Sequence, residues 1–126
     1  MRKSAAALVG TLLVAAIVLV WTTHAKAETV TGKLVDLNCY ALNKENTGNN
    51  HPGIGNICAQ ACAREGFTVG LLTSDEKVYF ISGDMAANEN AKLVAHMAHT
   101  VTLTGDVTQK DGTAWINVTD LKMVSK

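Results

Sequence analysis

Three cysteines, Cys39, Cys58 and Cys62, constrain this chain more than any other feature of its sequence. An odd number of thiols cannot all pair within one chain, so one is left over after any internal disulfide. Cys58 and Cys62 stand four residues apart, which predicts one face of a helix and Cβ atoms roughly 6 Å apart, beyond the ~4 Å of a disulfide. We therefore expect this pair to reach a common ion more easily than each other, whereas Cys39 can bridge to either.

The first residues of the chain predict export. Two basic residues precede an uncharged apolar run over residues 5–21, and an Ala-Lys-Ala string ending at Ala27 fits signal peptidase. We expect a signal peptide over residues 1–27 and a domain over 28–126. The apolar run also reaches the lower limit for a membrane span, so an uncleaved N-terminal apolar helix contacting the membrane through 5–21 is the alternative. Either way the domain is expected in the periplasm or on the outer face of the cytoplasmic membrane.

Charge and motifs exclude several classes of function. Eleven basic residues balance eleven acidic ones, which argues against a nucleic-acid partner. The sequence has no Gly-rich phosphate loop, Gly-x-Ser-x-Gly elbow or Cys-x-x-Cys redox motif. We therefore expect a protein that is not an enzyme.

Alternating apolar and polar residues predict a mainly β domain with two helices. A short helix over residues 57–65, begun by Asn56 and ended by Gly66, carries Cys58 and Cys62, and an amphipathic helix is expected over 88–99. The five strands are predicted at residues 29–40, 67–72, 77–82, 100–109 and 113–124, the last two joined by a Lys110-Asp111-Gly112 turn.

This order predicts a five-stranded, OB-like, partly open barrel. The Cys-bearing helix follows its first strand, and the second helix lies between its third and fourth strands. An open antiparallel sheet with both helices on one face is the alternative, because the same elements allow it.

Three strings, GKLVDLNCY, ICAQACAREGFTVGLLTSDEKVYFI and HTVTLTGDVTQKDGTAWINV, together with His51, resemble a group of small exported bacterial proteins. That group has a Gly-x-Val-x-Asp-x-x-Cys strand, a His, a Cys-x3-Cys helix and a final strand pair. The resemblance implies an OB-like barrel in the cell envelope, without a settled activity. Its matching positions here are Asp36, Cys39, His51, Cys58 and Cys62.

The cysteines allow two main interpretations. A disulfide from Cys39 to one of the other two closes a loop of about twenty residues and stabilises the domain by about 3 kcal/mol. Alternatively Cys39, His51, Cys58 and Cys62 form a Cys3His metal site, which suits zinc, while the soft thiolates also suit cuprous copper. Asp36 is a candidate to support His51 from behind, but a solvated strand residue is the interpretation that we favour for it.

Weaker interpretations complete the set. Covalent haem lacks its Cys-x-x-Cys-His string, and a thiol redox role is the other minor alternative. His96 and His99 can join a metal with Met97, but they also suit the last turn of the 88–99 helix and its apolar stripe, which we favour. The leading hypothesis is a metal-binding carrier or accessory subunit of a membrane-associated complex, and the alternative is a disulfide-stapled structural interaction module without metal.

Overall fold

The computed structural model describes residues 26–51 and 58–126 of the chain. The expected apolar helix over 5–21 and the capping residue Asn56 lie outside these described residues. No helix within the described residues is both long enough and apolar enough to cross a membrane.

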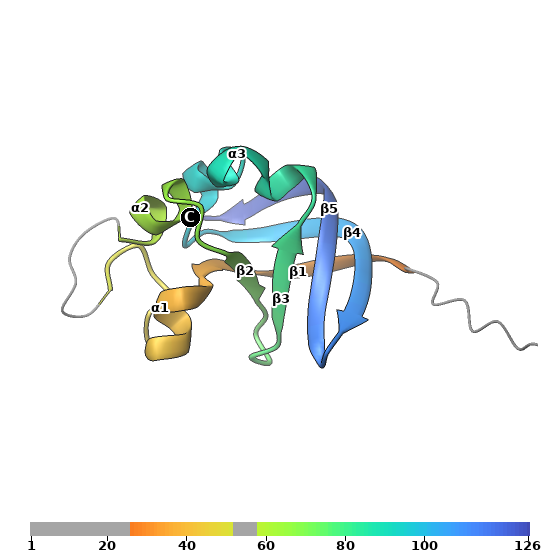
Figure 1. Cartoon of the computed structure of the whole chain (residues 1–126), viewed down its shortest axis with the longest axis horizontal. Coiled ribbons are helices and arrows are strands. Elements are labelled where there is room, and N and C mark those ends of the chain that lie inside the picture. The colour runs from red at the N-terminus through yellow and green to blue at the C-terminus, as the bar shows by residue number, and fades with distance from the viewer. Residues whose placement is uncertain (1–25, 52–57) are drawn as a thin grey trace, which may run out of the picture.

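Five strands form one sheet that closes on itself in a ring (Figure 1). Around the ring the order is β1, β2, β3, β5, β4 and back to β1, with β3 and β5 parallel and the other neighbours antiparallel. The strands are β1 (Lys26–Asp36), β2 (Val69–Leu72), β3 (Val78–Ser82), β4 (Thr100–Lys110) and β5 (Thr113–Ser125). The mainly β class and the five strands are confirmed.

The ring is closed, where the sequence predicted a partly open barrel or an open sheet. Closure follows from two long strands that pair on both sides. In β1, Lys33 faces Leu72 of β2 on one side and Thr100 of β4 on the other. In β5, Ala114 faces Tyr79 of β3 as well as a residue of β4.

The hydrophobic core fills the inside of this ring. On β4 the buried residues alternate with exposed or half-buried ones, as the sequence pattern predicted. Leu93 and Met97, from the segment before β4, are fully buried and belong to the same core. The strand residues of the core include Leu34, Val69, Leu71, Tyr79, Ile81, Val101, Leu103, Ile116 and Val118.

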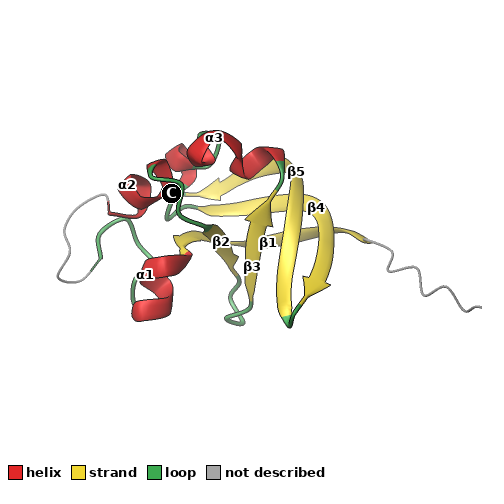
Figure 2. Ribbon diagram, viewed as in Figure 1, coloured by secondary structure: helices red, strands yellow, loops and turns green. Residues whose placement is uncertain are grey.

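Within residues 26–51 and 58–126, three short helices lie outside the ring, and α1 and α2 lie near each other in the view of Figure 2. They are α1 (Leu37–Leu42), α2 (Cys58–Arg64) and α3 (Ala87–Asn90), with 3-10 turns at Asp84–Ala86 and Val94–His96. The Cys-bearing helix is therefore confirmed as α2, but the strand predicted to reach Tyr40 ends at Asp36. The helix α1, which the sequence analysis did not predict, starts there because Asp36 is its N-cap. The Asp36 side chain accepts a hydrogen bond from the backbone N–H of Asn38.

The predicted single helix over residues 88–99 is wrong. Asn88, Glu89 and Asn90 have φ angles of 53°, 56° and 58°, in the left-handed region that breaks an α-helix. Asparagine enters this region more easily than most residues, and the Asn90 side chain is held by two carbonyl groups, those of Ala63 and Phe67. Between β3 and β4 the chain therefore forms several short turns in place of one long helix.

Candidate metal centre

Five polar side chains from three parts of the chain converge where β1 ends. Asp36 closes β1, Cys39 lies in α1, and His51 follows α1 in the connecting loop. Cys58 and Cys62 lie on α2, one turn apart. The four residues predicted from the sequence are thus brought together with Asp36.

The sulfur atoms form a compact triangle. The sulfurs of Cys39 and Cys58 and a ring nitrogen of His51 all lie within 4.8 Å of one another. The sulfurs of Cys39 and Cys62 and a carboxylate oxygen of Asp36 satisfy the same limit. Because the sulfurs of Cys58 and Cys62 are 3.9 Å apart, no side of the triangle exceeds 4.8 Å.

These separations suit a shared ion better than a disulfide. Four ligands at the ordinary Zn–S distance of about 2.3 Å stand roughly 3.8 Å from one another around a tetrahedral ion. A disulfide needs sulfurs about 2.05 Å apart, and all three cysteines are free thiols. His51 lies beside the Cys39–Cys58 side of the triangle and Asp36 beside the Cys39–Cys62 side, so each forms a group of three donors with two of the sulfurs.

His51 and Asp36 are buried with polar atoms that no described residue satisfies. His51 is 3% exposed, and neither of its ring nitrogens has a hydrogen-bond partner in the described part of the chain. Asp36 is 1% exposed, and while its Oδ1 accepts from Asn38, its Oδ2 has no N–H or O–H donor there. Buried polar atoms without partners are costly, and a bound cation would satisfy both side chains.

The surroundings favour protonated thiols when no cation is present. Burial, and then the charge of Asp36, raise the pKa of Cys39 to about 11 from 9.0. The pKa of Cys62 is raised as well, by burial first and then by the neighbouring Asp36 carboxylate. The thiols of Cys39 and Cys62 therefore stay protonated beside the Asp36 carboxylate.

Backbone contacts hold the cluster in place. The carbonyl of Cys39 accepts from the backbone N–H of Asn43 at 3.0 Å and from the side chain of Asn46 at 2.8 Å. On α2, the buried Ala59 donates its backbone N–H to the carbonyl of Asn49 at 3.3 Å, two residues before His51. These bonds tie the loop that carries His51 to both helices.

One residue of the cluster had a different role in the sequence analysis. Asp36 was favoured as a solvated strand residue, with support of His51 as the alternative, but it is 1% exposed and lies against the thiols of Cys39 and Cys62. The sequence marked Asp36 as a site residue, since it is one of the positions that carry the resemblance. The direction of its side chain, however, depends on the turn from β1 into α1. The alternation of apolar and polar residues predicted a strand as far as Tyr40, so it could not reveal this turn.

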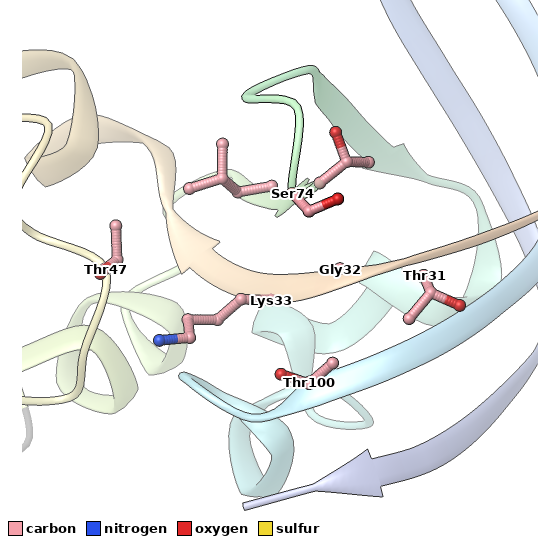
Figure 3. A pocket seen from close by; sticks show the side chains of 8 residues that line it. Thr31, Gly32, Lys33, Thr47, Ser74 and Thr100 are labelled. Carbon is pink, nitrogen blue, oxygen red and sulfur yellow. The ribbon is translucent and has the colours of Figure 1, made fainter.

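A separate hollow of about 380 Å³ lies on the surface of the ring (Figure 3). Lys33 is the charged residue that lines it, and most of the others carry hydroxyl groups: Thr31, Thr47, Thr73, Ser74 and Thr100. None of the five clustered residues lines this hollow, so the buried cluster and the hollow are distinct features.

Fold and site together define a small β-ring protein with a buried group of sulfur, nitrogen and oxygen donors close enough to hold a metal ion. No protein-family model, curated protein or solved structure matches the chain.

Proposed function

We propose that this protein is a non-enzymatic domain of the cell envelope that binds one transition-metal ion, as a carrier or as an accessory subunit of a membrane-associated complex. The observation that carries the proposal is the triangle of three thiol sulfurs with buried, unsatisfied His51 and Asp36 beside it. A purely structural role does not account for His51 and Asp36, because burying a polar side chain without a hydrogen-bond partner costs free energy.

The ligand set depends on the metal. Zinc prefers four ligands, and Cys39, Cys58, Cys62 and His51 supply the Cys3His set. Cuprous copper prefers soft ligands, so the three thiolates alone suit it. In either case the Asp36 carboxylate, which lies beside the thiols of Cys39 and Cys62, is placed to receive or release their protons when the thiolates bind an ion.

The proposed class is an OB-like barrel with export to the envelope. The closed five-stranded ring and the short helices between β3 and β4 support that class, as does the resemblance to small exported bacterial proteins. The apolar residues 5–21 support export and contact with a membrane. A carrier or accessory role follows from a metal site on a chain without enzyme motifs.

Metal analysis of the purified full chain tests the proposal. We expect about one equivalent of zinc or copper per chain, and three titratable thiols after the metal is removed and the chain is unfolded under anaerobic conditions. Cys58→Ser should remove most of the bound metal, while Ser74→Ala, a change on the surface outside the cluster, should leave it in place. Metal-free protein that binds neither ion in a competition titration contradicts the proposal.

A disulfide-stapled interaction module without metal is the second candidate. The observation that favours it is the sulfur of Cys39, which lies within 4.8 Å of the sulfurs of both Cys58 and Cys62. Closing one bond would leave a single free thiol. One titratable thiol in the unfolded chain, with no bound metal, would therefore support this candidate in place of the metal site.

A further inference from the structure

A second group of metal-binding side chains lies apart from the cysteines, where the segment before β4 meets the end of β5. His96 ends the 3-10 turn Val94–His96, and His99 directly precedes β4. Met123 belongs to β5 and faces Val101 in the register of the two strands. The C-terminus in Figure 1 marks this end of β5.

The donor atoms of these side chains are close. Nδ1 of His96 and Sδ of Met123 are 3.1 Å apart, and the ring centres of His96 and His99 are 6.4 Å apart. With metal–nitrogen and metal–sulfur bonds of about 2.0 and 2.3 Å, a nitrogen and a sulfur at this separation can bind one ion at an angle near 90°. A ring centre lies about 3 Å from an ion that its nitrogen binds, so one ion between the rings can reach both.

His99 also has an unsatisfied atom. Its Nδ1 is buried, and no described residue forms a hydrogen bond with it. The backbone around it is fixed, because the carbonyl of His99 accepts from Leu34 N–H at 3.1 Å and Ala98 N–H donates to the carbonyl of Leu34 at 2.9 Å. The backbone that carries the imidazole is thus fixed, and a ring nitrogen lacks a partner among the described residues.

The structural role favoured from the sequence does not account for these histidines. That role required the last turn of a long helix, whose dipole would favour positive charge, but the helix is broken and His96 ends a turn of three residues. Met97, the methionine expected near them, is fully buried in the core. Met123, 40% exposed and distant in sequence, takes its place beside His96.

We propose that His96, His99 and Met123 form a second metal site, selective for monovalent copper. Thioether sulfur is a soft ligand that favours cuprous copper, and imidazole binds copper as well. The site shares no residue with the cysteine cluster. It lies at the protein surface, whereas the cluster is largely buried, so it offers an ion a binding position in contact with solvent.

The test follows the methionine methyl signals of the full chain by NMR, with silver(I) as a stable probe of the monovalent copper site. We expect the Met123 methyl signal to shift and saturate with added silver(I), while that of Met85 stays in place. Zinc should leave the Met123 signal unmoved, because thioether sulfur is a poor ligand for zinc. Failure of the Met123 signal to respond to silver(I), or an equal response to zinc, overturns the proposal.

Matched variants locate the ions. In an anaerobic copper(I) competition titration, Met123→Leu, which keeps the side-chain volume, should weaken the binding of one equivalent by at least about tenfold, and Met85→Leu should not. His96→Gln should abolish the Met123 response, whereas Cys58→Ser should leave it intact even though it disables the cysteine cluster. Equal titration curves for the wild type and Met123→Leu overturn this site without bearing on the cluster.

Discussion

Asp36 uses its two carboxylate oxygens for different purposes. Oδ1 accepts from the backbone of Asn38 and begins α1, while the carboxylate also lies against the thiols of Cys39 and Cys62. One buried side chain therefore couples the start of a helix to the protonation of the cysteine cluster. The two functions can be separated, because asparagine caps helices as well as aspartate does but carries no charge.

Asp36→Asn should lower the pKa of Cys39 in the metal-free protein from about 11 toward the ordinary 9.0, because the carboxylate is the second largest cause of its rise. Burial remains, so the pKa should stay above the ordinary value. Ultraviolet absorbance of the thiolates during a pH titration measures the change. Asp106→Asn, on an exposed position of β4, is the control, and a titration curve unchanged in Asp36→Asn would contradict the assigned role.

The stability of the metal-free protein should fall in alkaline solution. The pKa of Cys39 is higher in the folded chain, about 11, than the 9.0 of an exposed thiol, so folding favours the protonated form. This contribution is complete below pH 9.0 and is lost as the pH rises through about 11. Urea unfolding with a chelator present, at a series of pH values, measures it.

The comparison for this experiment is Cys39→Ser, whose hydroxyl does not titrate in this range. Its unfolding free energy should fall less steeply with pH than that of the wild type. A wild-type curve that rises between pH 9.0 and 11 would contradict the burial of this thiol.

The cluster was largely predictable at the level of single residues. Cys58 and Cys62 follow from helical spacing alone, because any helix places such a pair on one face. That Cys39 and His51 lie near this pair follows from coordination chemistry, because together the four residues make up a Cys3His ligand set. The position of Asp36 could not be predicted in this way. It depends on the hydrogen bond from Asn38 that ends β1, whereas the apolar and polar alternation of the sequence continues beyond that point.

At the scale of elements, Asn90 joins α3 to the end of α2. Its side-chain amide donates to the carbonyls of Ala63 and Phe67, both at 2.9 Å, and the residue is 4% exposed. Ala63 lies at the end of α2, the helix that carries Cys58 and Cys62, and Phe67 lies just beyond it. The α2 helix is therefore held at its C-terminal end by a residue of the broken segment.

Asn90→Asp should destabilise the domain by about 2 kcal/mol, because the carboxylate keeps the shape but cannot donate to the two carbonyls. Denaturant unfolding measures the loss. Asn88→Asp is a matched control, since Asn88 has the same left-handed backbone with an exposed side chain, and it should change stability little. Equal effects of the two changes would contradict the role of the Asn90 amide.

The segment over residues 88–99 shows why helix prediction failed there. Apolar spacing correctly marked Leu93 and Met97 as buried, because burial depends on hydrophobicity whatever the local backbone. The same spacing does not distinguish a continuous helix from successive turns. Contacts of Asn90 with residues more than twenty positions away decide between them, and no local pattern contains those contacts.

At the scale of the whole molecule, the ring depends on a close approach between β4 and β5. The register shifts between Thr104 and Gly105, and a Cβ atom at Gly105 would lie 2.2 Å from the carbonyl oxygen of Asn117. The five strands were predictable because their alternation is local. The closure was not, because it requires this irregularity and the parallel pairing of β3 with β5.

Gly105→Ala should destabilise the domain by about 3 kcal/mol, since backbone would have to move to admit the methyl group. Gly48→Ala is the control, because a Cβ atom there meets nothing closer than 3.7 Å. Thermal unfolding of both variants, with the wild type, measures the difference. A Gly105→Ala variant as stable as Gly48→Ala would contradict the close approach of β4 to β5 at Gly105.

The parallel pairing of β3 with β5 also determines the order in which the chain can fold. Ala114 has to reach Tyr79 across thirty-five positions of sequence, so the ring can close only after β5 is available. Every cysteine lies before residue 63 and is synthesised well before that strand. Until β5 docks, the thiols lack the burial that raises the pKa of Cys39 and Cys62 in the finished domain, so we expect them to react more readily with oxidants and metal ions before the ring closes than afterwards.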